Sequence, residues 1–381
     1  MDFKAFVKNR HQYAREWKQR TGGKVLGFFD TYFPEELAYA AGVLPVRILA
    51  DHEPDNISDK WIYASCYPTR DMINQFLRGT NEYMDGIVTS EGFCQWMFHV
   101  FEVVTNNKPE LFAHYMFVPD YSEVSSAKIA LRSELEVFRG KLEQWTGKTI
   151  TDEALDNAIE VYNTNRRLLR KIYELRRANQ SVILGSEAMN VMLACQIMDK
   201  AEANQMLLKF VEELEERKPY DDRIRLMLVG SETYNTDLEE LVESLGGNIV
   251  IDELDNGTSY CWNEVIPQKD RLLAIALRYL GRPHNPIKDC NWLRRPQHIF
   301  ELYEDWSVDG VLIAKQIYCV PHGTDNYSVW KLLRERHILF HFFERDNSIP
   351  IDETKLRMEA FMNMLRPGLV RLVGWNTPLT I

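Results

Sequence analysis

The chain has 381 residues, 45% of them hydrophobic and 27% charged, with a formal net charge of −11 at pH 7. This length predicts two or three domains with substantial cores, and the acidic balance argues against a nucleic-acid partner, whose binding surfaces are basic. No apolar run reaches the roughly 18 residues of a membrane span, and the charged N-terminus lacks the apolar core of a signal peptide, so we expect a cytoplasmic protein without membrane association.

The first elements in the chain form a βαβ pattern. Residues 1–20 have the spacing of an amphipathic helix. A strand from Lys24 to Phe29, a helix beginning near Pro34 and a strand from Val43 to Leu49 follow. Proline is favourable in the first turn of a helix, where its missing N–H is not needed.

The same order of elements returns in the second half of the chain. A strand from Arg225 to Val229 precedes a helix from Asp237 to Leu245 and a strand from Asn248 to Asp252. A Thr-Tyr pair follows the first strand of each unit, at Thr31 and at Thr233. The repetition predicts an α/β fold of two doubly wound, Rossmann-like or flavodoxin-like lobes.

The chain between the two units is strongly helical, and Thr151 is expected to begin one of its helices. We therefore predict a first α/β lobe with an N-terminal helix in residues 1–121, a helical region in 122–218 and a second α/β lobe in 219–381.

The chemistry of the chain is most visible in its cysteines, which are Cys66, Cys94, Cys195, Cys261, Cys290 and Cys319. A disulfide framework is not expected in a reducing compartment. No Cys-x-x-Cys pair occurs, which argues against a zinc ribbon or a ferredoxin-type cluster motif. Any metal site must therefore combine distant cysteines.

Three of the cysteines share one kind of position. Cys94 and Cys319 end apolar strands that begin with Asp-Gly, in "MDGIVTSEGFCQW" and "VDGVLIAKQIYCVPHG", and Cys66 lies at the end of a loop before a helix starting near Arg70. Ligands of open α/β sheets bind outside the carboxyl ends of the strands. Three thiolates there could hold an iron–sulfur cluster, or zinc with one open position. Each thiol taken alone is more simply explained as a buried core residue, which is how we interpret the other three cysteines.

These motifs occur in an order that resembles one known family. The stretches "FPEELAYAAGVLPVRI", "SCYPTRDM", "DGIVTSEGFCQWMFHVFE" and "DGVLIAKQIYCVPHGTDNY" are similar to those of the 2-hydroxyacyl-CoA dehydratases and benzoyl-CoA reductases, over most of the chain. The resemblance implies a [4Fe–4S] cluster held by Cys66, Cys94 and Cys319, with the fourth iron site left for another ligand.

The resemblance also implies partners. They are a homologous cluster-bearing subunit, ATP-hydrolysing activator subunits with their own cluster, and ferredoxin as the electron donor. The chain itself has no GxxxxGK[ST] loop, in keeping with ATP use by the activator subunits rather than by this chain.

Departures from the dehydratase pattern favour the reductase branch. Gln95 and Val320 follow the second and third cysteines, where dehydratases often have acidic residues, and aromatic residues crowd the second motif, at Phe93, Trp96, Phe98 and Phe101. We therefore expect a subunit of an ATP-dependent benzoyl-CoA reductase, an oxidoreductase active only in a hetero-oligomer, that reduces an aromatic acyl-CoA to a cyclic diene in anaerobic aromatic degradation. The alternatives are a 2-hydroxyacyl-CoA dehydratase subunit, a catalytically silent scaffold or electron-relay subunit, and a two-lobed binding protein without metal.

Such a reduction also needs a proton donor. His322 is the titratable residue nearest in sequence to a predicted ligand, and we expect Pro321 and Gly323 to turn the chain so that its side chain faces the substrate. Glu253 and Tyr260, near Asp252 at another strand end, are the second candidates. A loop histidine bonded to backbone, and a turn-stabilising cluster, are the structural alternatives.

Overall fold

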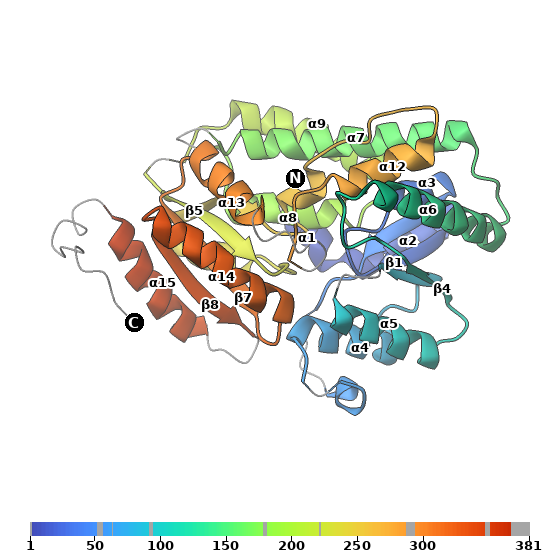
Figure 1. Ribbon diagram of the computed structural model, residues 1–381, viewed down its shortest axis with the longest axis horizontal. Coiled ribbons are helices and arrows are strands. Elements are labelled where there is room, and N and C mark those ends of the chain that lie inside the picture. Colours follow the sequence, from blue (N-terminus) through green and yellow to red (C-terminus); the bar gives the residue numbers. More distant parts are fainter. Residues whose placement is uncertain are drawn as a thin grey trace.

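A computed structural model describes residues 2–51, 56–62, 64–90, 94–177, 181–220, 222–286, 294–346 and 351–366 (Figure 1). Two parallel sheets of four strands each lie side by side and are flanked by helices. The predicted α/β fold of two Rossmann-like lobes is therefore confirmed.

The two sheets have the same topology. The first has the order β2-β1-β3-β4 and the second the order β6-β5-β7-β8, and every neighbouring pair is parallel. The strands are β1 (Lys24–Phe28), β2 (Val43–Arg47), β3 (Gly86–Ser90), β4 (Phe112–Met116), β5 (Ile224–Gly230), β6 (Gly247–Glu253), β7 (Gly310–Gln316) and β8 (Phe340–Arg345).

The repeat extends to individual hydrogen bonds. The Asp85 carboxylate accepts from the amide of Val25 at 2.9 Å, and the Asp309 carboxylate accepts from the amide of Arg225 at 2.8 Å. In both lobes the glycine after this aspartate pairs with the third residue of the first strand. The two Asp-Gly pairs noted in the sequence thus occupy equivalent positions, where each connects the two central strands of its sheet in the same register.

The helices of the first lobe are α1 (Phe3–Lys8), α2 (Arg10–Thr21), α3 (Glu35–Ala40), the 3₁₀ turn η1 (Ile57–Lys60), α4 (Tyr67–Arg78) and α5 (Gln95–Asn107). The single helix expected over residues 1–20 is instead two helices that meet at Asn9, which ends α1 and begins α2. The helix expected from Arg70 begins at Tyr67, because Pro68 is compatible with the first turn.

The helical region contains α6 (Ser125–Thr146), α7 (Asp152–Glu174), α8 (Gly185–Cys195) and α9 (Lys200–Glu216). Thr151 begins α7 as expected, with its side chain accepting from the amide of Ala154 at 3.2 Å. The second lobe adds α10 (Asp237–Ser244), α11 (Thr258–Cys261), α12 (Arg271–Leu280), α13 (Arg294–Asp305), α14 (Val320–Glu335) and α15 (Ile351–Leu365). Helix α12 of the second lobe packs against α6 of the helical region. The domain boundaries themselves remain a prediction.

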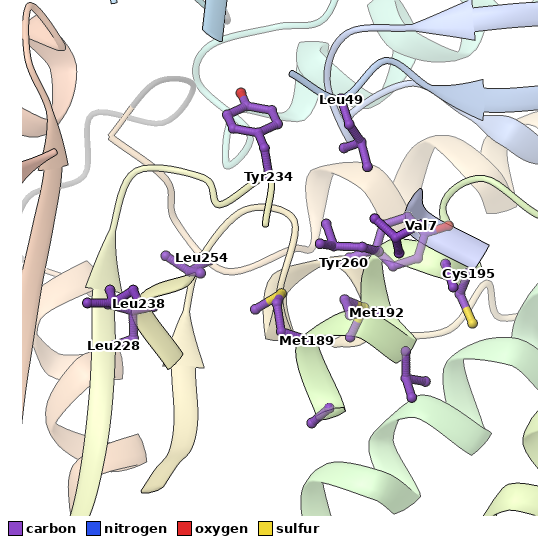
Figure 2. Packing of buried hydrophobic residues seen from close by; sticks show 14 of the residues in the cluster. Val7, Leu49, Met189, Met192, Cys195, Leu228, Tyr234, Leu238, Leu254 and Tyr260 are labelled. Carbon is purple, nitrogen blue, oxygen red and sulfur yellow. The ribbon is translucent and has the colours of Figure 1, made fainter. Parts of the chain in front are cut away.

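One hydrophobic core joins the parts of the molecule. It includes Leu49 from the first lobe, Leu228 and Leu238 from the second, and Met189 and Met192 from α8. Figure 2 shows these α8 side chains between residues of the two lobes. The lobes therefore do not meet as independent bodies, and their strand ends have a defined relative position. Among the described residues, no helix is long and apolar enough to cross a membrane.

Candidate functional site

The three cysteines singled out in the sequence each stand immediately before a helix. Cys66 is the N-cap of α4, Cys94 the N-cap of α5 and Cys319 the N-cap of α14. Cys94 and Cys319 follow the carboxyl ends of the equivalent strands β3 and β7. The first lobe thus supplies two thiols and the second lobe one.

The sharp turn expected at Pro321-His322-Gly323 does not form. These residues make up the first turn of α14, where the amide of Gly323 donates to the carbonyl of Cys319 at 3.0 Å. Proline fixes φ near −65° and lacks only an N–H that the first turn does not use, so Cys-x-Pro begins a helix here as it does at Cys66. The expected orientation of His322 by a turn is therefore wrong.

The thiols lie close enough together to affect one another. Burial raises the pKa of the Cys94 thiol to about 12, and negative charge on Cys66 and on Cys319 raises it as well. Burial and the neighbouring Cys319 likewise raise the pKa of Cys66. All three cysteines are free and partly exposed. The fold therefore gathers thiols from both lobes at one partly open place.

The helix N-termini lower the pKa values of the three thiols, in opposition to burial. Backbone amides of Thr69, Met97 and His322, in the first turns of α4, α5 and α14, favour the thiolates of the three cysteines and oppose the rise in pKa. Such termini carry partial positive charge, which stabilises thiolate. The amides thus offset part of the penalty that burial places on three thiolates, the soft ligands that iron–sulfur clusters and zinc prefer.

A cluster and a single ion require different spacings of three thiolates. In the described part of the chain, no three His, Cys, Asp or Glu side chains are arranged to hold one metal ion. A single zinc at about 2.3 Å from each sulfur would require the thiols almost in contact. A cluster takes each thiolate on a different iron, which permits wider spacing. Three free thiols are the donor type that such a cluster takes.

A second set of side chains adjoins the thiols from the second lobe. Glu232, two residues beyond β5, accepts a hydrogen bond from the Tyr234 hydroxyl at 2.8 Å. Burial raises the pKa of Glu232 to about 7 against the opposing charge of Arg47. Burial raises the pKa of Cys319, and negative charge on Glu232 adds to the rise. Burial and Glu232 raise the pKa of Tyr234, and charge on Cys66 adds to that rise.

Neither Glu232 nor its partner Arg47 was predicted from the sequence. A signal was present, because Asp30 and Glu232 both stand directly before the repeated Thr-Tyr pair. Asp30 accepts hydrogen bonds from the backbone and side chain of Ser90, at 2.8 and 2.6 Å. An acidic residue at the carboxyl end of the first strand is therefore common to both lobes.

His322 lies in the first turn of α14 but is buried, with 2% of its surface exposed. Its Nδ1 has no hydrogen-bond partner in the described part of the chain. Burial, with the nearby charges of Arg295 and Lys315, lowers its pKa well below the usual value. The imidazole is therefore neutral near pH 7, carrying one N–H that it can donate.

Glu253 and Asp252, the other predicted acids of β6, are both engaged. The Arg295 guanidinium donates to the two carboxylate oxygens of Glu253 at 3.1 and 2.5 Å, and it also binds Asp325. Burial raises the pKa of Glu253 to about 7 despite this pairing. Asp252 accepts from the amide of Thr258 at 2.8 Å. The charge of Arg295 thus lowers the pKa of both Glu253 and His322, in each case after the larger effect of burial.

Tyr260 belongs to a different buried network. Its hydroxyl donates to Glu35 at 2.6 Å and accepts from the Lys200 ammonium at 2.6 Å. Lys200 is also paired with Glu35 at 3.2 Å. The structure therefore brings the three cysteines together, whereas Tyr260 makes its hydrogen bonds where the first lobe, α9 and the second lobe meet.

Of the remaining cysteines, Cys195 and Cys261 are buried in the core, and Figure 2 shows Cys195 on α8. Cys290 lies outside the described residues, as does Phe93.

Comparison with known proteins identifies the family. The profile of the family described as 2-hydroxyglutaryl-CoA dehydratase, D-component, matches residues 30–365. The chain belongs to this family. The resemblance stated from the motifs is thereby confirmed.

Several curated relatives align over most of the chain at low identity. The (R)-phenyllactyl-CoA dehydratase beta subunit of Clostridium sporogenes is 24% identical, covering 96% of this chain and 98% of that protein. A benzoyl-CoA reductase subunit of Thauera aromatica is 26% identical, covering 81% and 82%. The beta subunit of (R)-2-hydroxyglutaryl-CoA dehydratase of Acidaminococcus fermentans is 24% identical, covering 83% and 86%. Dehydratases and a reductase are thus matched at similar levels.

Proposed function

We propose that this chain is a [4Fe–4S]-bearing subunit of an acyl-CoA-reducing complex, and that Cys66, Cys94 and Cys319 ligate the cluster. The observation that carries the proposal is the gathering of three free thiols at three helix N-termini. When bound, such a cluster supplies single electrons at a potential set by charge, hydrogen bonding and exposure. Three cysteine ligands leave one iron for a non-protein ligand or substrate.

The surroundings of the thiols support a substrate with an apolar part. Tyr318 and Val320, on either side of Cys319, are 53% and 70% exposed. Trp96 stands two residues after Cys94 in α5. A flat aromatic acyl group can be buried against such side chains, which would exclude water from the place where charge develops.

The complex that we propose is an ATP-dependent benzoyl-CoA reductase, in which this chain takes the place of the related subunit of Thauera aromatica. The departures at Gln95 and Val320 from the acidic residues of the dehydratases favour it, as does the likeness to that benzoyl-CoA reductase subunit. The complex would also need a homologous cluster-bearing subunit, activator subunits that hydrolyse ATP, and ferredoxin as electron donor.

A second candidate is the beta subunit of a 2-hydroxyacyl-CoA dehydratase. The nearly complete coverage of the phenyllactyl-CoA dehydratase beta subunit favours it. Both candidates use the same thiols, so the ligand assignment does not depend on the choice between them.

Substrate assays on the complete complex separate the two. The chain is purified anaerobically with the homologous subunit, and activator, ATP and reduced ferredoxin are added. Benzoyl-CoA and (R)-phenyllactyl-CoA are then supplied separately. Conversion of benzoyl-CoA to a cyclic dienoyl-CoA supports the reductase. Loss of water from phenyllactyl-CoA without reduction of benzoyl-CoA would support the dehydratase instead of the reductase. Bound iron without either activity would favour a scaffold or relay subunit.

A further inference from the structure

A buried ion pair joins the two lobes at their strand ends. Arg47 is the last residue of β2 in the first lobe, and Glu232 follows β5 in the second. Arg47 Nη2 lies 2.6 Å from each carboxylate oxygen of Glu232. Their side chains are 0% and 5% exposed. This pair spans the carboxyl ends of the two sheets.

The pair is arranged to fix a position rather than to add stability. A buried ion pair is often replaceable by apolar residues without loss of stability, because desolvation offsets the attraction. Arg47 makes only part of its possible contacts, since its Nε and Nη1 have no hydrogen-bond partner in the described part of the chain. What the pair does provide is a directional contact between two strand ends.

The end of β5 also contacts the segment that carries Cys319. Ser231, next to Glu232, accepts from the amide of Gln316 at 3.1 Å, and the Gln316 carbonyl accepts from the amide of Cys319 at 3.0 Å. The amide of Arg47 donates to the carbonyl of Gln196 at 2.8 Å, which fixes the end of β2 against the segment after α8. The ion pair therefore lies between the lobe that carries Cys66 and Cys94 and the lobe that carries Cys319.

We propose that Arg47 and Glu232 are positioning residues that hold the Cys319 thiol at the distance from Cys66 and Cys94 that a shared cluster requires. The role of this spacing in cluster binding rests on the proposed function. The claim that the ion pair sets the spacing of the thiols does not. A cluster has fixed size, and its three ligands come from two lobes, so the relative placement of the lobes decides whether all three can bind. Other inter-lobe hydrogen bonds, such as Thr31 to Asp255 at 2.5 Å and Tyr260 to Glu35 at 2.6 Å, limit how far the lobes separate without the pair.

The test uses a variant in which both partners are replaced, Arg47→Met with Glu232→Met. Replacing both avoids an uncompensated buried charge, so the melting temperature should stay within about 3 °C of the parent. The matched control is Arg10→Met with Asp51→Met. This largely buried pair lies within the first lobe, between α2 and the segment after β2.

Thiol spacing is measured on the metal-free full chain with dibromobimane, which becomes fluorescent when it bridges two nearby thiols. Mass spectrometry of the peptides identifies bridges between Cys319 and Cys66 or Cys94. We expect these bridges to form about tenfold more slowly in the Arg47 and Glu232 variant, because the effective concentration of the thiols falls. The control should match the parent. Iron per chain after reconstitution should fall in the same variant alone.

Equal bridging rates in parent and variant would overturn the inference, and so would an equal loss in the control. The outcome for the proposed function is separate. If the parent takes up no iron and yet the variant alone loses its bridges, the positioning role stands and the cluster assignment fails.

Discussion

The thiols of Cys66 and Cys319 belong to different lobes, yet they lie near enough that the charge of Cys319 adds to the rise in the pKa of Cys66 that burial causes. Each thiol precedes a helix that has proline at its second position. The interaction between the two thiols depends on the observed arrangement of the two lobes. We therefore expect removal of either thiol to affect the same bound group.

Replacing Cys66, Cys94 or Cys319 by serine should lower the iron content of the reconstituted chain severely, because a lost thiolate ligand is a lost metal bond. Cys195→Ala serves as the control, because Cys195, the last residue of α8, is buried in the hydrophobic core of the protein. Iron and acid-labile sulfide are measured per chain. Iron lost from Cys195→Ala but kept in Cys94→Ser would contradict the ligand assignment.

His322→Ala should keep the cluster and its EPR signal while slowing substrate reduction by about 10²–10⁴-fold, the usual range for a lost proton-transfer group. Because the imidazole is buried and neutral, it would act through its N–H rather than as imidazolium. His99→Ala, at an exposed position on α5, is the control. Parental turnover would move the proton donor elsewhere, with Glu253→Gln tested next. Loss of iron would show a structural role or a ligand.

Glu239→Gln should change how stability depends on pH. Burial raises the pKa of Glu239 to about 7, and neither carboxylate oxygen has a hydrogen-bond partner in the described part of the chain. The folded protein therefore binds a proton that the unfolded chain releases between its ordinary pKa of 4.5 and about 7, and this group lowers stability as pH rises through that window.

The parent should accordingly lose about 2–3 kcal/mol more than Glu239→Gln between pH 4.5 and pH 7.5, measured by urea unfolding at each pH. Glu212→Gln, an exposed position on α9, should follow the parent. Parallel pH curves for the parent and Glu239→Gln would show that Glu239 is ionised at no cost in the folded protein.

Tyr260→Phe should destabilise the fold by about 1–3 kcal/mol, because it removes one hydroxyl between two buried charged groups. Glu35 loses a donor and Lys200 loses an acceptor, while their mutual contact at 3.2 Å remains. Urea unfolding of the metal-free chain measures the change. An unaltered midpoint combined with lost activity would instead return Tyr260 to the list of proton donors.

The cysteine positions could be predicted because they follow from local pattern. The Asp-Gly steps before β3 and β7 fix where each central strand begins, so the cysteines after them necessarily lie at the carboxyl edge of each sheet. The turn predicted at Pro321 was wrong because Pro-His-Gly is compatible with both a turn and a first helical turn. The two conformations differ in whether Cys319 is the N-cap of a helix, and the structure shows that it is.

Arg47 and Glu232 could not be paired from the sequence. Their contact depends on how the two lobes are placed, and that placement is set by the shared core around α8 rather than by any local pattern. The burial of His322 likewise depends on Arg295 and the packing of α13 against α14. Tertiary contacts of this kind leave no periodic signal in the chain.

The most direct test of the account is anaerobic reconstitution of the full chain, followed by iron and sulfide analysis and EPR of the reduced protein. We predict about four iron and four sulfide per chain with the EPR signal of a reduced [4Fe–4S] cluster, abolished by Cys94→Ser and retained by Cys195→Ala. A colourless chain that takes up no iron with its homologous subunit present, or one that binds a single zinc instead, would contradict it.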